Sequence, residues 1–309
     1  MRMEISLSRF KAHIELLRPP LAPMDLAMPA ASALLASYAV SKALPPLWPF
    51  IIATMGAYCA ITSSYVFNDC CDIEVDKVGM PDRPLPSSRL SRREAMAWSF
   101  LLFLFAAAAA LYLNPESFAA LIAATAIITI YSSWAKRSTP FSWIFVGLAF
   151  GLVPLGVWLA IEPAGWLKEG PGLHPAGIIL AAMICITDWG FTNCDASRDV
   201  EGDSAEGIPT TPATYGIPAT AKMVAFFWFV GILLSIALGL SAGLGYLYLV
   251  MAVLAGGWLM LQNIDFVNHP TSKRGDYLFY QSASYRAIIF VAIILDVLLR
   301  TAISNSTFF

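Results

Sequence analysis

Oxygen-bearing side chains recur at helical spacing in one run of the sequence, Asn68-Asp69-Cys70-Cys71-Asp72-Ile73-Glu74-Val75-Asp76. On an α-helix, which turns by about 100° per residue, Asn68, Asp72 and Asp76 lie within about 80° of one another, and Asp69 lies close beside them. Like charges four residues apart destabilise a helix slightly. The run is therefore either a solvated helix face or, as we interpret it, a face that binds a cation.

A second acidic run repeats this spacing 127 residues further along the chain. Its members, in order, are Asp195, Asp199 and Asp203, which superpose on Asn68, Asp72 and Asp76. We interpret the two runs as copies of an internal repeat. A matched pair favours a cation-binding role, because a solvated face has no reason to recur with the same spacing.

Oxygen ligands favour a hard cation, and Mg²⁺ usually takes one or two carboxylates together with substrate phosphates and water. The six side chains therefore predict two metal-binding walls with a diphosphate between them. Basic residues should approach the same diphosphate, since arginine suits bidentate phosphate contacts and lysine a point-charge contact. The candidates are Arg83, in a proline-rich loop, and the adjacent pair Lys136 and Arg137, which are alternatively topology anchors.

The elements that must hold these residues are membrane helices. Of the 309 residues, 58% are hydrophobic and 13% charged, against about 45–50% and about 25% in a soluble domain. A membrane span needs about 20 mostly apolar residues. Nine such stretches are found: Leu21–Val40, Leu47–Phe67, Ala95–Leu113, Phe118–Trp134, Phe141–Ile161, Pro175–Phe191, Ala221–Leu240, Gly243–Leu261 and Tyr285–Leu299. The sequence predicts an all-α polytopic membrane bundle of nine transmembrane helices, forming a single domain over residues 1–309.

Lysine and arginine placement predicts the orientation of this bundle. Sixteen of the 19 basic residues lie in the N-terminal segment and every second segment after it, and only Lys42, Lys168 and Arg300 lie in the others. By the positive-inside rule the N-terminus is cytoplasmic. Four spans separate the two acidic runs, so both open to the cytoplasmic side.

Other classes of site are not indicated. The net charge of −2 provides no basis for nucleic-acid binding. The five cysteines and three histidines lack the spacing of a disulfide framework or a zinc site. The opening segment Met1–Arg18 is charged and roughly amphipathic, which favours a cytoplasmic surface helix over a secretory signal.

The motifs resemble those of one protein family. The run NDCCDIEVD is similar to the NDxxDxxxD motif of the UbiA superfamily of intramembrane prenyltransferases, and Asp195–Asp203 resembles the second aspartate motif of that family. Arg83–Ser87 resembles the family's RPLPSG segment, Tyr131–Thr139 its Y…KR.T loop, and Gly207–Pro212 its GIxTLP segment. The likeness covers nearly the whole chain.

The resemblance implies a bundle around a central cavity, capped on the cytoplasmic side and open laterally to lipid. It implies that Mg²⁺ at the two motifs binds an isoprenyl diphosphate, that the allylic C–O bond ionises, and that the prenyl group passes to a lipophilic acceptor, for example an aromatic one. The implied metal ligands are Asn68, Asp72, Asp76, Asp195, Asp199 and Asp203. Asn68, Asp195, Arg83, Lys136 and Arg137 are implied to bind substrate, with Asp72, Asp199 and Tyr131 acting at the reacting centre.

No motif in the sequence identifies the acceptor of the prenyl group. Cys70 and Cys71 stand where many relatives carry aromatic residues, which reshapes the space between the metal ligands. Asp25, Asp188 and Asp265 lie in or at spans and are either acceptor ligands or paired polar groups. Two other functions stay open: a UbiA-type terpene cyclase, which captures the allylic cation within the same molecule, and a cation transporter with intramembrane acids.

Overall fold

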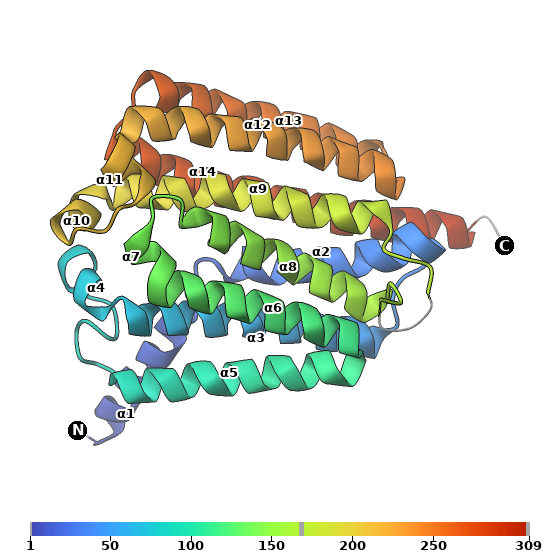
Figure 1. Cartoon of the computed structure of the whole chain (residues 1–309). Helices are drawn as coiled ribbons and strands as arrows, with labels where there is room; N and C mark the ends of the chain where they lie inside the picture. The colour runs from blue at the N-terminus through green and yellow to red at the C-terminus, as the bar shows by residue number, and fades with distance from the viewer. Residues whose placement is uncertain (1, 167–169, 307–309) are drawn as a thin grey trace.

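The computed structural model describes residues 2–166 and 170–306, and within these ranges the chain is helical with no strand. Lys168, one of the three basic residues predicted on the non-cytoplasmic side, lies outside the described residues. In this part of the chain, nine long helices run side by side along one axis (Figure 1). They are α2 (Ala22–Ser41), α3 (Leu47–Cys71), α5 (Arg92–Leu113), α6 (Pro115–Ile130), α8 (Trp143–Ile161), α9 (Pro175–Arg198), α12 (Ile217–Ala242), α13 (Tyr246–Asn268) and α14 (Ser272–Ser306).

The prediction of an all-helical membrane bundle is confirmed, although the number of spans is not. Within the described ranges, eight helices are long and apolar enough to cross a membrane. The ninth long helix, α2, is not among them because it carries Asp25 and several serines. Most of α2 is nevertheless buried, and it packs against α14, α8 and α3. A helix surrounded by protein does not need the hydropathy of one that faces lipid.

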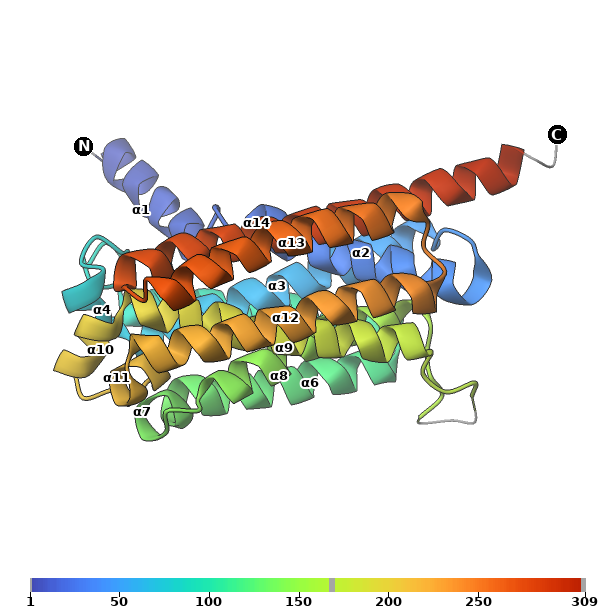
Figure 2. The ribbon, with the colours of Figure 1, turned by 90° about the horizontal axis from the view of Figure 1, so that it is seen from above.

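Short elements gather at one end of the bundle. The surface helix predicted over Met1–Arg18 is observed as α1 (Arg2–Leu16), which projects from this end beside the N-terminus (Figure 2). The others are α4 (Ile73–Gly79), η1 (Tyr131–Ala135), α7 (Lys136–Ser138), α10 (Val200–Ala205) and α11 (Thr211–Tyr215). The C-terminus lies at the opposite end (Figure 1). The end at which the short elements gather contains both acidic runs.

Several helices extend beyond the apolar stretches that predicted them. Helix α9 continues from the predicted end at Phe191 to Arg198, and α14 starts at Ser272, well before the predicted Tyr285. The added turns are polar, so hydropathy alone does not detect them. They carry the acidic runs past the apolar layer while keeping helical geometry.

Close helix contacts hold the bundle together. At Gly190 of α9 a Cβ would lie 2.7 Å from Nε1 of Trp228 on α12, and at Gly147 of α8 it would lie 2.3 Å from the Trp189 ring of α9. Trp228 is fully buried. Small residues that admit a large neighbour are the usual means of packing helices in membranes, where no hydrophobic effect drives helices together.

Candidate active site

Both acidic runs are built in the same way, as a long helix that bends at its middle aspartate and continues as a short helix. Helix α3 ends before Asp72 and α4 follows it, while α9 ends before Asp199 and α10 follows it. The φ and ψ angles are −104° and 12° at Asp72, and −94° and 10° at Asp199. The amide of Asp72 still donates to the Asn68 carbonyl at 3.0 Å, and that of Asp199 to the Asp195 carbonyl at 3.2 Å. The predicted spacing therefore survives the bend, and the shared geometry supports an internal repeat.

Asp72 is the most deeply buried acid of the first run and is paired with two cations. It is 2% exposed. Nζ of Lys136 lies 2.5 Å from one carboxylate oxygen and Nη2 of Arg137 lies 2.7 Å from the other. Arg137 also donates to the carbonyls of Cys71 and Ser132. Both predicted basic residues therefore reach the first motif, and neither is only a topology anchor.

The loop after α4 brings Arg83 to the same wall. Nη1 of Arg83 lies 2.8 Å from Asp76 and 3.5 Å from Asp69. The loop is tied down by buried Leu85, whose carbonyl accepts from the Ser88 amide at 3.0 Å. Ser88 has a φ of 58°, a left-handed conformation that disfavours most residues. This accounts for the glycine expected at this position in the family pattern.

The second wall is more exposed and has a basic partner that the sequence reasoning did not select. Arg198 lies 2.7 Å from Asp195 and 2.8 Å from Asp199, whose side chains are 41% and 40% exposed. Asp203 is buried and accepts a hydrogen bond from Thr210 at 3.0 Å. Arg198 stands three residues after Asp195, a spacing that would have indicated the pair.

The two walls are neighbours, as a helix contact and the charges that act on Asp203 both indicate. Helix α10 contacts α4 (Figure 1). Burial raises the pKa of Asp203 to about 6, although the Lys136 charge and the hydrogen bond from Thr210 act to lower it. Burial likewise raises the pKa of Asp76, although Arg83 opposes the shift. Lys136, which pairs with Asp72 on the first wall, is thus also a neighbour of Asp203 on the second.

Tyr131 lies near acids of both walls. The charges of Lys136, Asp72, Asp195 and Asp203 all act on its side chain. Tyr131 opens the π-helical segment η1, which separates α6 from Lys136. A π-helical turn adds a residue to the local winding and is frequent at functional sites. Here it directs Tyr131 and Lys136 toward the same space.

Asn68 is the one uncharged side chain among the six predicted metal ligands. Its side-chain amide donates to Ser132 Oγ at 3.3 Å, which leaves its carbonyl oxygen available. All six predicted metal ligands therefore lie at one end of the bundle. Five are carboxylates and one is an amide, so the set consists of oxygen donors only.

The residues suit Mg²⁺ only in combination with a further oxygen-rich ligand. Within residues 2–166 and 170–306, no three Asp, Glu, His or Cys side chains form a group that could hold a metal ion. Mg²⁺ tolerates such a sparse site because it keeps waters and substrate phosphates in its shell. The raised pKa values of Asp76 and Asp203 show that burial of these carboxylates outweighs the positive charge of Arg83 and Lys136 beside them, so neither acid is fully compensated. A divalent cation would supply the remaining positive charge.

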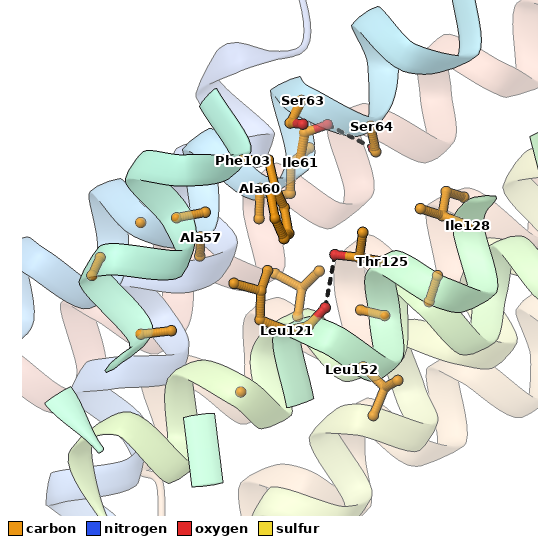
Figure 3. A pocket seen from close by; sticks show the side chains of 18 of the residues that line it. Ala57, Ala60, Ile61, Ser63, Ser64, Phe103, Leu121, Thr125, Ile128 and Leu152 are labelled. Carbon is orange, nitrogen blue, oxygen red and sulfur yellow. Dashed lines mark hydrogen bonds between the residues drawn. The ribbon is translucent and has the colours of Figure 1, made fainter. Parts of the chain in front are cut away.

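A cavity of about 420 Å³ begins beside the walls and runs down the bundle between α3, α5, α6 and α8. Its lining residues belong almost entirely to the N-terminal half of the chain. The cavity extends from Phe67, next to Asn68, to Ile52, a distance of about 22 Å on a helix that rises 1.5 Å per residue. Phe103 projects between the Ala57–Ile61 side of α3 and Leu121 (Figure 3). The lining is almost entirely apolar, apart from hydroxyls such as those of Ser63, Ser64 and Thr125.

Comparison with known proteins identifies relatives over nearly the whole chain. The sequence model described as the UbiA prenyltransferase family matches residues 27–291. The chain is 28% identical over 288 residues to the digeranylgeranylglyceryl phosphate synthase of Thermococcus kodakarensis, covering 91% of this chain and 97% of that protein. It is 26% identical over 254 residues to the protoheme IX farnesyltransferase of Korarchaeum cryptofilum, covering 81% and 83%.

A solved structure shares the fold. It is a UbiA homolog from Archaeoglobus fulgidus bound to GPP and Mg²⁺, with a TM-score of 0.58 and 17% identity, covering 91% of this chain and 99% of that one. The names of the two relatives indicate different reactions, since one is a synthase of digeranylgeranylglyceryl phosphate and the other a farnesyltransferase of protoheme IX.

Proposed function

Because the chain belongs to the UbiA prenyltransferase family, we propose that it is a Mg²⁺-dependent intramembrane enzyme that ionises an isoprenyl diphosphate and transfers the prenyl group to a lipophilic acceptor. The observation that carries the proposal is the pair of equivalent acidic walls, which face each other with Lys136, Arg137 and Arg83 between or beside them. The Archaeoglobus fulgidus homolog binds GPP and Mg²⁺, which is the ligand class that these walls suit.

The metal ligands follow from the two walls. Mg²⁺ would be held by Asn68, Asp72 and Asp76 on one side and by Asp195, Asp199 and Asp203 on the other. When bound, it supplies positive charge that stabilises the departing diphosphate. The walls differ in burial, since Asp72 is 2% exposed while the Asp195 side chain is 41% exposed.

The basic residues exchange partners when substrate binds. Lys136 and Arg137 both pair with Asp72, and Arg83 pairs with Asp76. In the substrate complex these three cations would bind the diphosphate oxygens, and the carboxylates that they release would hold Mg²⁺. Fixed cations aimed at a leaving group lower the barrier more in a water-poor site than in water.

Tyr131 faces the carbon from which the diphosphate departs. Its aromatic face stabilises the allylic cation by a cation–π contact. The apolar cavity below it takes the prenyl chain, and its walls exclude water that would capture the cation. Lateral entry from the bilayer is consistent with the partly exposed α5 side of this cavity, where Phe100 is 60% exposed.

We propose that the chain crosses the membrane nine times and that its active site faces the cytoplasm. Helix α2 is the ninth span, because it is 20 residues long and runs beside α14 in the bundle. The short helices α4, α7 and α10 lie at the end of the bundle where α1 projects (Figure 2). The segments at this end carry most of the lysine and arginine residues, so the positive-inside rule assigns this end to the cytoplasm.

The test is product analysis with purified protein in lipid vesicles. C10 to C20 prenyl diphosphates are supplied with Mg²⁺, with and without a membrane lipid extract, and diphosphate and organic products are measured by mass spectrometry. We expect diphosphate release that requires Mg²⁺ and a prenylated lipid that requires the extract. Hydrocarbon or alcohol products that form equally without extract would identify a terpene cyclase, and cation flux without substrate consumption would identify a transporter.

A further inference from the structure

A second polar cluster lies inside the bundle, below the acidic walls. It consists of Asp25 on α2, Tyr65 on α3, Asp188 on α9 and Arg286 on α14. Asp25, Asp188 and Arg286 are 1%, 2% and 4% exposed. Ionisable groups buried at membrane depth are costly and usually serve a function. The diphosphate site uses none of these four residues.

Asp25 lacks a cation of its own. The Tyr65 hydroxyl donates to its two carboxylate oxygens at 3.2 and 3.1 Å. In the part of the chain that the structure describes, no lysine or arginine lies within ion-pair distance of Asp25. The nearby Arg18 guanidinium stacks on the Tyr65 ring at 4.7 Å but is paired with Asp69 at 2.8 Å.

Arg286 has an unused donor. One end of its guanidinium donates to Asp188 at 2.9 Å and to Thr187 at 3.2 Å. Its planar group lies over Phe191 at 4.8 Å and near Trp228 at 5.8 Å. Its Nε is buried and has no hydrogen-bond partner. The charges of Arg286 and Asp188 both act on Asp25, so the four residues form one electrostatic unit.

The cluster lies about two helical turns below the acidic walls. Tyr65 stands seven residues before Asp72, and Asp188 stands seven residues before Asp195, which places each about 10 Å below its wall on a helix that rises 1.5 Å per residue. Tyr65 also stacks on Phe150 at 6.3 Å, and Phe150 lines the apolar cavity. The cluster is therefore beside the space in which the reacting end of the prenyl chain would lie.

The charges of the cluster select for a neutral ligand. Two carboxylates and one guanidinium leave one excess negative charge, which repels a phosphate or carboxylate head group. A hydroxyl group complements the cluster, because it can donate to Asp25 and accept from Nε of Arg286. Such a hydroxyl would share the Asp25 carboxylate with Tyr65 and would give Nε of Arg286 the hydrogen-bond partner that it lacks.

We propose that this cluster binds the nucleophilic hydroxyl of the acceptor, that the acceptor is a neutral lipid with a free hydroxyl, and that Asp25 takes its proton. The inference rests on the proposed function. The bond from C1 of the prenyl group to the diphosphate oxygen breaks, and its electron pair leaves with the diphosphate. A lone pair of the acceptor oxygen forms the new bond to C1, and the hydroxyl proton passes to the Asp25 carboxylate.

The experiment separates ionisation from transfer. Geranylgeranyl diphosphate is the donor, and the acceptor probes are the neutral and the acidic lipid fractions of a membrane extract. Slow Mg²⁺-dependent release of diphosphate without acceptor reports ionisation, and labelled lipid product reports transfer. Failure of the wild-type protein to release diphosphate would refute the proposed function itself, whichever result the acceptor fractions gave.

We expect the wild-type protein to prenylate the neutral fraction. Asp25→Asn should lower transfer at least about 100-fold, the smaller end of the usual range for general acid–base catalysis, while acceptor-free ionisation changes less than twofold. Tyr65→Phe keeps the ring contacts and should lower transfer about tenfold through loss of a hydrogen bond to a charged group. Glu116→Gln is the control, because Glu116 is a buried carboxylate at the start of α6, where it accepts from the amides of Ala164 and Gly165; it should leave both activities unchanged.

The proposal is refuted if product forms in the acidic fraction alone or in neither fraction. Equal losses of ionisation and transfer in the Asp25 variant would also refute it, since that residue would then be structural. The Tyr65 variant decides the matter if Asp25→Asn does not fold, because unaltered transfer in Tyr65→Phe contradicts a hydroxyl site at this cluster.

Discussion

The pairing of Asp72 with Lys136 and Arg137 makes its carboxylate the most informative one to remove. In Asp72→Asn the side chain keeps its size and loses its charge. Asp72 is 2% exposed, and it is the only predicted metal ligand with two cations in contact. The variant therefore removes one negative charge from the Mg²⁺ site and leaves two basic side chains with one partner fewer.

The expected magnitudes can be worked from these contacts. Breaking a fully buried ion pair typically costs about 3–5 kcal/mol. The Arg137 side chain is 36% exposed and keeps two carbonyl partners, so we expect a stability loss nearer about 2 kcal/mol after allowing for solvent screening. The effect on catalysis should be larger. Loss of one preorganised group that stabilises transition-state charge costs about 100- to 1,000-fold in rate.

The assay measures diphosphate release over a range of Mg²⁺ concentrations, with thermal unfolding in detergent as the check on folding. Glu74→Gln is the matched control. It removes a carboxylate two residues away, which is 77% exposed and contacts only Lys77. If Asp72→Asn keeps diphosphate release within about tenfold of the wild type, which is about 1.4 kcal/mol of barrier, the assignment of Asp72 to the metal site is wrong.

Four further predictions test other parts of the structure. Arg198→Gln frees Asp195 and Asp199 from their shared cation, so Mg²⁺ affinity in the absence of diphosphate should rise several-fold, measured by calorimetry; unchanged affinity would exclude these two acids as ligands. Because burial raises the pKa of Asp203 to about 6, protons compete with Mg²⁺ below that pH, and the Mg²⁺ concentration for half-maximal activity should rise as the pH falls from 7 to 5. Thr210→Val removes a hydrogen bond that lowers this pKa, so the same loss should begin at higher pH. Phe103→Ala opens the middle of the cavity (Figure 3) and should shift the kcat/KM preference toward longer prenyl diphosphates; an unchanged preference would show that the chain lies elsewhere.

The sequence predicted the acidic walls well because their geometry is local. Spacing by four along a helix places Asn68, Asp72 and Asp76 on one face, and a bend at Asp72 leaves that spacing intact. The same reasoning detected the second run and the equivalence of the two. Hydropathy likewise identified the helical bundle, because a segment surrounded by lipid must be apolar along its own length.

Interactions between distant segments could not be predicted in this way. Arg18 reaches Asp69 across 51 positions, and Asp25, Asp188 and Arg286 meet from three helices. Apart from Asp69, which belongs to the first acidic run, each of these residues had appeared in the sequence only as an isolated charge in or near an apolar stretch. Helix α2 is a different case. The stretch Leu21–Val40 predicted it as a span, yet among the described residues it does not belong to the helices that are apolar enough to cross a membrane. Most of its residues are buried by neighbouring helices.

By itself, the sequence determined the class of the protein and the two helical runs of oxygen-bearing side chains that we propose to bind a cation. These properties depend on residue type and on spacing within one helix, and both are written along the chain. The tertiary structure decided which cation neutralises which acid, where the apolar cavity lies, and that four buried polar residues share one site. Those properties depend on which helix faces pack together, and that choice is made by the shapes of side chains far apart in the sequence.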